Sequence, residues 1–181
     1  NSASVGRGIY KTLDGGRTWN KLGLEKTERI HRIVLHPEDA QTAWVSAFGT
    51  SWGENAERGV FKTTDGGATW QKILFVDERT GCSDLIIDPR NPDKLFASMW
   101  QHRRWPWSFK SGGPGSGLYR TLDGGTNWQR LDESDGLPTG ELGRIGLAIS
   151  ASSPNTIYAL TEAKKSVLLR SDDGGFTFRT V

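Results

Sequence analysis

The chain has 181 residues and carries 23 basic and 21 acidic side chains, which leaves a formal net charge of +2. A charge this close to neutral predicts no binding to nucleic acid or to an anionic membrane surface, and the absence of an apolar run of about 18 residues predicts no membrane insertion. The single cysteine, Cys82, excludes an internal disulfide. The composition is unusual in its 23 glycines and 8 tryptophans, a profile typical of short aromatic strands joined by tight turns.

Four short strands are expected in each of three consecutive units. In the first complete unit an apolar run near residues 32–35 is followed by runs at 42–47, 59–63 and 69–74, with Pro, Asn, Asp or Gly between them. Segments 32–47, 84–99 and 146–161 align without a gap, so the units are repeats. The expected boundaries are a half unit at residues 1–22 and whole units at 29–76, 81–132 and 143–181.

One motif marks the turn between the third and fourth strands of every unit. Its copies read KTLDGGRTW, KTTDGGATW, RTLDGGTNW and RSDDGGFTF, and their aspartates are Asp14, Asp65, Asp123 and Asp173. Four-stranded units that repeat about every 40 to 50 residues are typical of β-propeller blades. We therefore predict an all-β partial propeller of about three and a half blades, to be completed by the remaining blades of a longer chain or by a self-association partner.

The residues of the motif suit a structural turn better than a metal site. Paired glycines accept positive φ, and the aspartate accepts hydrogen bonds from amides of its own turn. An aromatic residue five positions later is expected to bury against the blade, and these aromatics are Trp19, Trp70, Trp128 and Phe178. A calcium loop would need a closing glutamate that the motif lacks. The sequence predicts no metal and no cofactor.

The pattern [ST]-x-D-G-G-x-[TN]-[WF] resembles the Asp-box, or BNR repeat, of sialidases, sortilin-type receptor domains, xyloglucanases and the photosystem II stability factor. The resemblance covers the whole chain and is greatest to bacterial proteins described as BNR-repeat glycosyl hydrolases or sortilin-like. Only Asn127 and Phe178 depart from the ideal motif. The resemblance implies a propeller, an extracytoplasmic (periplasmic or secreted) location without a signal peptide in this segment, and Asp-boxes on the rim, away from the ligand site.

Function is expected at the end of the blades opposite the Asp-boxes, where the loops between second and third strands lie. These loops are residues 48–59, 100–117 and 162–165, and the first two hold four of the tryptophans. Aromatic rings beside arginines stack on sugars, clamp peptides or hold carboxylates, whereas the alternative is that they pack the long loop onto its neighbour. The ligand-binding candidates are Trp52, Trp100, Arg103, Arg104, Trp105, Trp107 and Arg144.

We expect a non-catalytic segment that recognises a protein, a peptide or a glycan. The alternative is part of a glycoside hydrolase, sialidase-like or xyloglucanase-like, whose site needs the complete propeller. Such an enzyme requires two carboxylates about 5 to 10 Å apart, which sequence spacing cannot identify, so the catalytic residues stay unknown. The connectors offer Glu28, Glu78, Asp84, Glu133, Asp135 and Glu141, and Arg29, Arg79 and Arg144 are candidates for a sialidase-type arginine triad.

Overall fold

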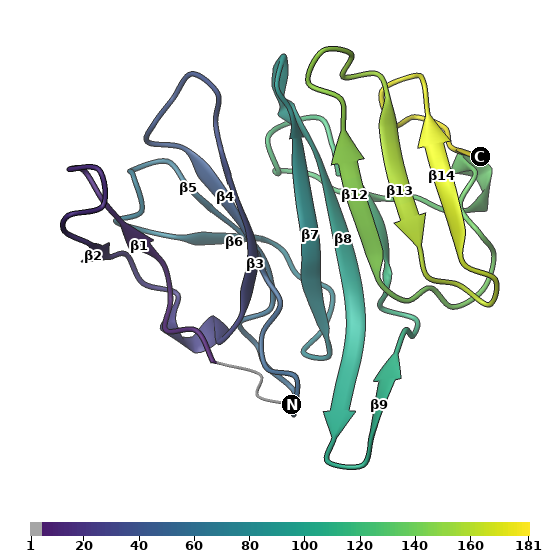
Figure 1. Cartoon of the computed structure of the whole chain (residues 1–181), viewed down its shortest axis with the longest axis horizontal. Helices are drawn as coiled ribbons and strands as arrows, with labels where there is room; N and C mark the ends of the chain where they lie inside the picture. Colours follow the sequence, from purple (N-terminus) through teal and green to yellow (C-terminus); the bar gives the residue numbers. More distant parts are fainter. Residues whose placement is uncertain (1–4) are drawn as a thin grey trace.

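The computed structural model describes residues 5–181, so the first four residues of the expected half blade lie outside the described part. It is built almost entirely of antiparallel strands in four sheets (Figure 1), which confirms the all-β prediction. The first sheet pairs β1 (Tyr10–Lys11) with β2 (Asn20–Lys21). The second has the order β3-β4-β5-β6, with bounds Ile30–Leu35, Ala43–Ala47, Gly59–Thr63 and Gln71–Leu74.

The third and fourth sheets follow the same meander. The third has the order β11-β10-β8-β7, with β7 at Thr80–Asp88, β8 at Asn91–Trp105, β10 at Gly117–Thr121 and β11 at Gln129–Arg130, and β9 (Ser108–Ser111) pairs with β8 alone. The fourth has the order β12-β13-β14-β15, with bounds Ile145–Ile149, Ile157–Thr161, Val167–Ser171 and Arg179–Thr180. Two 3-10 turns, η1 (Glu25–Thr27) and η2 (Glu133–Asp135), lie in the connections between sheets.

The Asp-boxes gather at one end of the sheets. In each complete sheet the first glycine of the motif donates its N–H to a carbonyl in or just after the turn between the first two strands, as in the bond from Gly66 N to Gln41 O of 2.8 Å. We call this end the Asp-box face. The loops between second and third strands, and the connectors between sheets, share the other end, the loop face, where Asn55 N donates to Glu78 O at 2.8 Å. The β8–β9 hairpin projects from that end (Figure 1).

The carboxylate of each Asp-box aspartate accepts hydrogen bonds from residues of its own turn. Asp65 Oδ1 accepts from Thr69 N at 2.9 Å, and Oδ2 accepts from Thr69 Oγ1 at 2.6 Å. Thr63 Oγ1 donates to Asp65 Oδ1 at 2.7 Å and accepts from Gly67 N at 2.9 Å. These bonds, led by the one from the Thr69 hydroxyl, hold the pKa of Asp65 far below its ordinary range. The carboxylate is therefore a turn acceptor, as its place in the motif predicts.

Burial of the motif aromatics depends on whether a neighbouring blade is present. Phe178 is buried, Trp70 and Trp128 are half-buried, but Trp19 is 59% exposed. The expectation that each ring buries is therefore wrong for Trp19. Its indole N–H bonds Gly16 O at 3.1 Å, as that of Trp128 bonds Gly125 O, but among the described residues no sheet packs beyond the first one to cover the ring.

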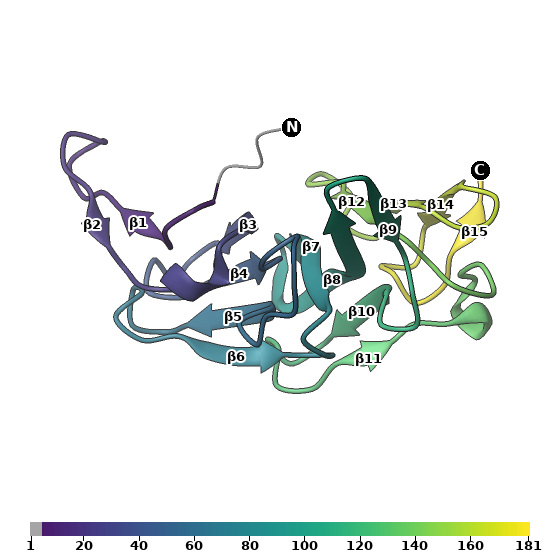
Figure 2. The same ribbon diagram turned by 90° about the horizontal axis from the view of Figure 1, so that it is seen from below.

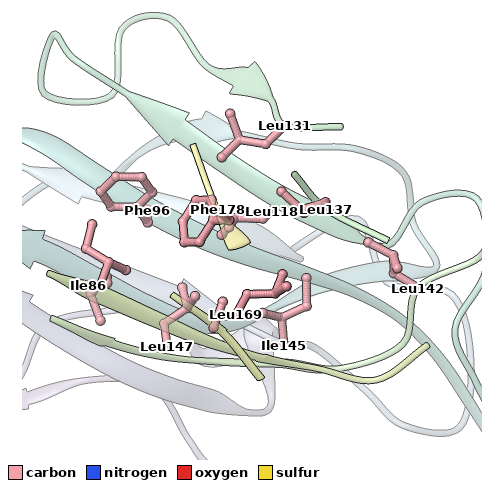
Figure 3. Packing of buried hydrophobic residues seen from close by; sticks show 12 residues of the cluster. Ile86, Phe96, Leu118, Leu131, Leu137, Leu142, Ile145, Leu147, Leu169 and Phe178 are labelled. Atoms are coloured by element: carbon pink, nitrogen blue, oxygen red, sulfur yellow. The ribbon is translucent and has the colours of Figure 1, made fainter. Parts of the chain in front are cut away.

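Within residues 5–181 the hydrophobic core consists of three clusters, one between each pair of successive sheets. The first joins Ile9 to Val45 and Phe61, and the second joins Trp44 to Leu85 and Leu95. The third and largest lies between the third and fourth sheets (Figure 3), and its labelled residues are Ile86, Phe96, Leu118, Leu131, Leu137, Leu142, Ile145, Leu147, Leu169 and Phe178. Because each sheet buries its faces against its neighbours, the stack of sheets, seen from below in Figure 2, fixes the positions of the loops that leave its ends.

Candidate functional site

The segment 100–117, expected to be a long loop, is mostly a β-hairpin. Strand β8 continues to Trp105, and β9 returns from Ser108, with Trp105 opposite Ser108 in the register. Aromatic residues favour the extended chain, and the two residues between the strands, Pro106 and Trp107, make the reversal. The following stretch is also packed, since Ser116 is fully buried and its hydroxyl accepts from Gln101 N at 2.9 Å.

An aromatic cluster anchors this hairpin to the rest of the loop face. His31 stacks on Phe48 with ring centroids 4.7 Å apart. Phe48 in turn lies 5.3 Å from Trp100, and Trp100 lies 4.5 Å from His102. The cluster joins β3, the 48–59 loop and β8, and it brings together two histidines that sequence spacing leaves unrelated. It holds the base of the hairpin at a fixed position.

Two of the ligand-binding candidates take part in this packing. Trp100 donates its indole N–H to Ser111 Oγ at 3.0 Å, inside the hairpin. The guanidinium of Arg144 lies 5.7 Å from the Trp100 ring centroid, in cation–π range. Trp100 and Arg144 therefore occupy the positions expected under the packing alternative.

A cleft of about 270 Å³ opens beside the hairpin, between it and the 48–59 loop. Its lining residues are Gly53, Glu54, Arg79, Gln101, His102, Arg103, Trp105, Lys110 and Gly112. Arg103 and Trp105 are the two sequence candidates that it contains. Trp107 is 82% exposed at the hairpin tip and Trp52 is 43% exposed, and neither lines the cleft. Arg104 connects the hairpin to the 48–59 loop, because its main-chain N–H donates to Ser51 O at 2.8 Å.

Arg58 holds the loop that forms one wall of the cleft, and it was not among the residues that the sequence indicated. Arg58 is fully buried, and its guanidinium donates to the carbonyls of Phe48 at 2.8 Å, Thr50 at 2.6 Å and Gly53 at 2.9 Å. Burial lowers its pKa to about 10, so it stays charged at neutral pH. A positive charge satisfied by main-chain oxygens leaves no pairing pattern in the sequence. Its place directly before the third strand was the available signal.

His102, at the base of the cleft, is a neutral histidine. It is 8% exposed, and its burial, reinforced by the positive charges of Arg58, Arg104 and Arg29, lowers its pKa from 6.5 to about 4. The unfolded chain therefore binds a proton below pH 6.5 that the folded chain refuses until about pH 4.

Stability should consequently fall as the pH drops through this window. We expect the free energy of unfolding in urea to be about 2 kcal/mol lower at pH 5 than at pH 7.5. The variant His102→Gln should lose the part of the difference that this residue contributes, because it has no proton to take up, while His31, whose pKa burial also lowers, keeps a dependence of the same sign. An unchanged difference in His102→Gln would contradict the assignment to this residue.

Three of the six carboxylates offered as catalytic candidates have structural partners. Asp84 Oδ1 pairs with Arg32 Nη2 at 3.0 Å, and its Oδ2 accepts from Leu147 N at 2.9 Å, so it ties together the first strands of three sheets. Glu28 pairs with Arg29 at 3.2 Å, and Asp135 Oδ2 caps η2 by accepting from Asp132 N at 2.9 Å. Glu54 is the one carboxylate among the residues that line the cleft.

Other site chemistries find little support in the part of the chain that the structure describes. Among residues 5–181 no group of three His, Cys, Asp or Glu side chains is placed to hold a metal ion. Cys82 is fully buried in β7, and burial raises the pKa of its thiol. Of the arginines offered as a triad, only Arg79 lines the cleft. No helix within this range is long and apolar enough to cross a membrane.

Two xyloglucanases are similar to this chain in sequence. Over 144 residues, or 75% of this chain, the sequence is 27% identical to a xyloglucanase of Paenibacillus sp.. Over 178 residues, or 97% of the chain, it is 26% identical to a xyloglucanase of Hypocrea jecorina. The chain spans only 13% and 18% of the length of these two relatives.

The solved structures agree on the fold. The glycoside hydrolase family 74 xyloglucanase of Xanthomonas campestris superposes with a TM-score of 0.70 at 15% identity, covering 97% of this chain and 27% of that one. This likeness confirms the partial β-propeller that the repeat predicts. The sequence model described as "Sortilin-Vps10: Sortilin, neurotensin receptor 3" matches residues 7–166. The chain therefore belongs to the Sortilin-Vps10 family of Asp-box propeller proteins.

Proposed function

We propose that this chain is one part of a larger propeller and that it binds a polysaccharide across the loop face. The cleft between the β8–β9 hairpin and the 48–59 loop carries the proposal, because it places an aromatic ring beside polar groups in a concave site. The relatives named as xyloglucanases favour a glycan over a protein or a peptide as the ligand.

Trp105 is the side chain that best fits contact with a sugar. It is 36% exposed, and the Arg103 guanidinium lies 5.6 Å from the centroid of its ring. Trp105 is the last residue of β8 and its main chain pairs with Ser108, so the ring extends from a strand and not from an irregular loop. A flat apolar face held in this way suits stacking against a pyranose ring.

The variant Trp105→Ala tests the proposal. We expect it to weaken binding of a xyloglucan oligosaccharide about tenfold, measured by isothermal titration calorimetry, because the stacking surface is removed. Adding Trp107→Ala should weaken binding further only if the ligand extends over the hairpin tip.

The matched control is Trp19→Ala, since Trp19 is also an exposed tryptophan but lies on the Asp-box face. This variant should bind the oligosaccharide as the unchanged chain does. If Trp105→Ala and Trp107→Ala together leave the fold and the affinity unchanged, the cleft is not the glycan site.

A second candidate function is that the segment contributes to a glycoside hydrolase, which the two xyloglucanase relatives favour. Glu54 is the carboxylate that the cleft offers, and its catalytic counterpart would have to come from outside the cleft. The test is release of reducing sugar from xyloglucan. If the chain releases it and Glu54→Gln abolishes the release but retains binding, this candidate is favoured over binding alone.

We also propose that further blades, from the same protein or from a second copy, cover the open side of β3. Ile33 and Leu35 are 49% and 65% exposed there, whereas Leu85, in the slot of Ile33 in the next sheet, is fully buried. An apolar strand face left in water favours a covering blade. The family resemblance and the xyloglucanase relatives favour a location outside the cytoplasm.

A further inference from the structure

We propose that the glycan bound in the Trp105 cleft is acidic, and that Arg79, Arg103 and Lys110 hold the carboxylate of a uronic acid residue. This inference rests on the proposal that the loop face binds a glycan, and it adds the charge of that glycan. The printed names of the relatives assign no charged ligand to this cleft.

The charge of the cleft lining is the first support. The lining includes three basic side chains, Arg79, Arg103 and Lys110, against the single carboxylate of Glu54. Of the three, Arg79 has an ion pair of 3.8 Å with Asp77, while within residues 5–181 neither Arg103 nor Lys110 has one. A concave surface with unneutralised positive charge attracts an anion.

Unpartnered polar atoms are the second support. Within the described residues, Arg103 Nε is buried and has no hydrogen-bond partner. The same is true of Nδ1 of His102, a side chain that is 8% exposed and lines the cleft. A buried donor without an acceptor is unfavourable, and a ligand oxygen that accepts from it removes the penalty. Arg103 Nε is such a donor, because a guanidinium nitrogen donates and does not accept, so it points to a ligand that supplies an acceptor.

The positive field extends beneath the cleft. Arg58 belongs to the 48–59 loop that forms one wall of the cleft, and its three hydrogen-bond acceptors are neutral carbonyl groups; Asp77 and Glu28 offset part of its charge without forming an ion pair with it. Arg104 is the next residue of β8 and has no ion pair among the described residues. A neutral glycan would leave this field unused, whereas a carboxylate would make charge-assisted hydrogen bonds, the stronger kind.

A carbohydrate carboxylate fits the cleft better than a peptide carboxylate. The Trp105 ring stands beside Arg103, so one residue supplies a platform for a sugar ring and the next but one supplies a partner for its C6 carboxylate. β8 is paired with β9 along one edge of the hairpin, and on its other edge the main-chain N–H groups of His102 and Arg104 already donate to Arg79 O and Ser51 O. A peptide that adds a strand would need a free main-chain edge, which this part of β8 lacks.

The test compares tetragalacturonic acid with its fully methyl-esterified form, which keeps the sugar chain and removes the charge. We expect the acid to bind the whole chain about tenfold more tightly at low salt, and this advantage to shrink at high salt. Arg103→Gln and Lys110→Gln should each remove much of the advantage. Lys164→Gln, an exposed lysine of the 162–165 loop outside the cleft, should retain it.

The outcomes separate this inference from the proposed function. If the ester or a neutral xyloglucan oligosaccharide binds as well as the acid, the inference fails and glycan binding stands. If no glycan binds, both fail. If a peptide with a free C-terminal carboxylate binds more tightly than the acid and depends on Arg103, the sugar assignment is overturned. Unchanged acid binding in both glutamine variants would place the acid elsewhere.

Discussion

Replacing Arg58 by leucine is expected to lower the free energy of unfolding by about 3 kcal/mol and to weaken glycan binding in the same step. The substitution keeps an apolar stem but leaves the buried carbonyl of Phe48 and the half-buried carbonyls of Thr50 and Gly53 without their donor. Each unsatisfied carbonyl costs about 1 kcal/mol or more, so the three together decide the sign even though burying a charge is itself unfavourable.

The loop that Arg58 holds is the reason for the second effect. The chain reverses direction over residues 48–59 around the side chain of Arg58. Gly53 and Glu54 of this loop form one wall of the cleft. Phe48, at its start, also carries the aromatic cluster beneath the hairpin. Once the carbonyls lose their donor, the loop and the cleft wall should shift together.

Urea unfolding and calorimetry with the oligosaccharide measure the two effects. Arg17→Leu, at an exposed position on the Asp-box face, is the matched control and should change neither. Arg58→Lys should lie between, because one ammonium keeps the charge but cannot reach three separate carbonyls as a guanidinium does. An unchanged unfolding curve for Arg58→Leu would show that the loop is held by its other contacts.

The repeat made most of the fold predictable from the sequence. Trp44 and Phe96, aligned in one slot by the repeat, are both buried between sheets. The opposition of Asp-boxes and variable loops followed from the alternation of an antiparallel meander, and the turn bonds of Asp65 followed from the residue types. Such features depend on neighbours in the same strand or turn, which a sequence displays directly.

The site was less predictable, because its parts come from different blades. Surplus tryptophan pointed to the right segments, but Trp100 and Trp105 look alike in sequence and differ in fate. Trp100 packs on Phe48 of the preceding blade. Trp105, the last residue of β8, directly precedes the two-residue turn of the hairpin and its ring stays partly exposed. Arg58 was missed because its partners are main-chain oxygens. A contact between blades decided the burial of Trp100, whereas main-chain partners in its own loop decided that of Arg58.

Contacts between blades also set the largest effect expected on the Asp-box face. Gly175→Ala should cost about 3 kcal/mol of unfolding free energy, and Gly16→Ala only about 1 kcal/mol. Both glycines hold the second position of the motif with nearly the same backbone, φ +87° for Gly175 and +92° for Gly16. The strain of placing alanine at positive φ is therefore shared.

The two positions differ in what an added methyl group would meet. At Gly175 it would lie on the ring of Phe96, a fully buried residue of the preceding blade. At Gly16 the nearest atom is 3.9 Å away, in the exposed ring of Trp19 of the same turn. A packed core resists such an insertion, which costs about 1 to 3 kcal/mol beyond the backbone strain.

Urea unfolding of the two alanine variants side by side makes this comparison. Equal losses would mean that the second glycine serves the turn alone. A larger loss for Gly175→Ala would mean that the Asp-box also brings its turn against the preceding blade. Under that result the motif has two structural roles on one face, which leaves the loop face, and the Trp105 cleft within it, as the place to look for ligand.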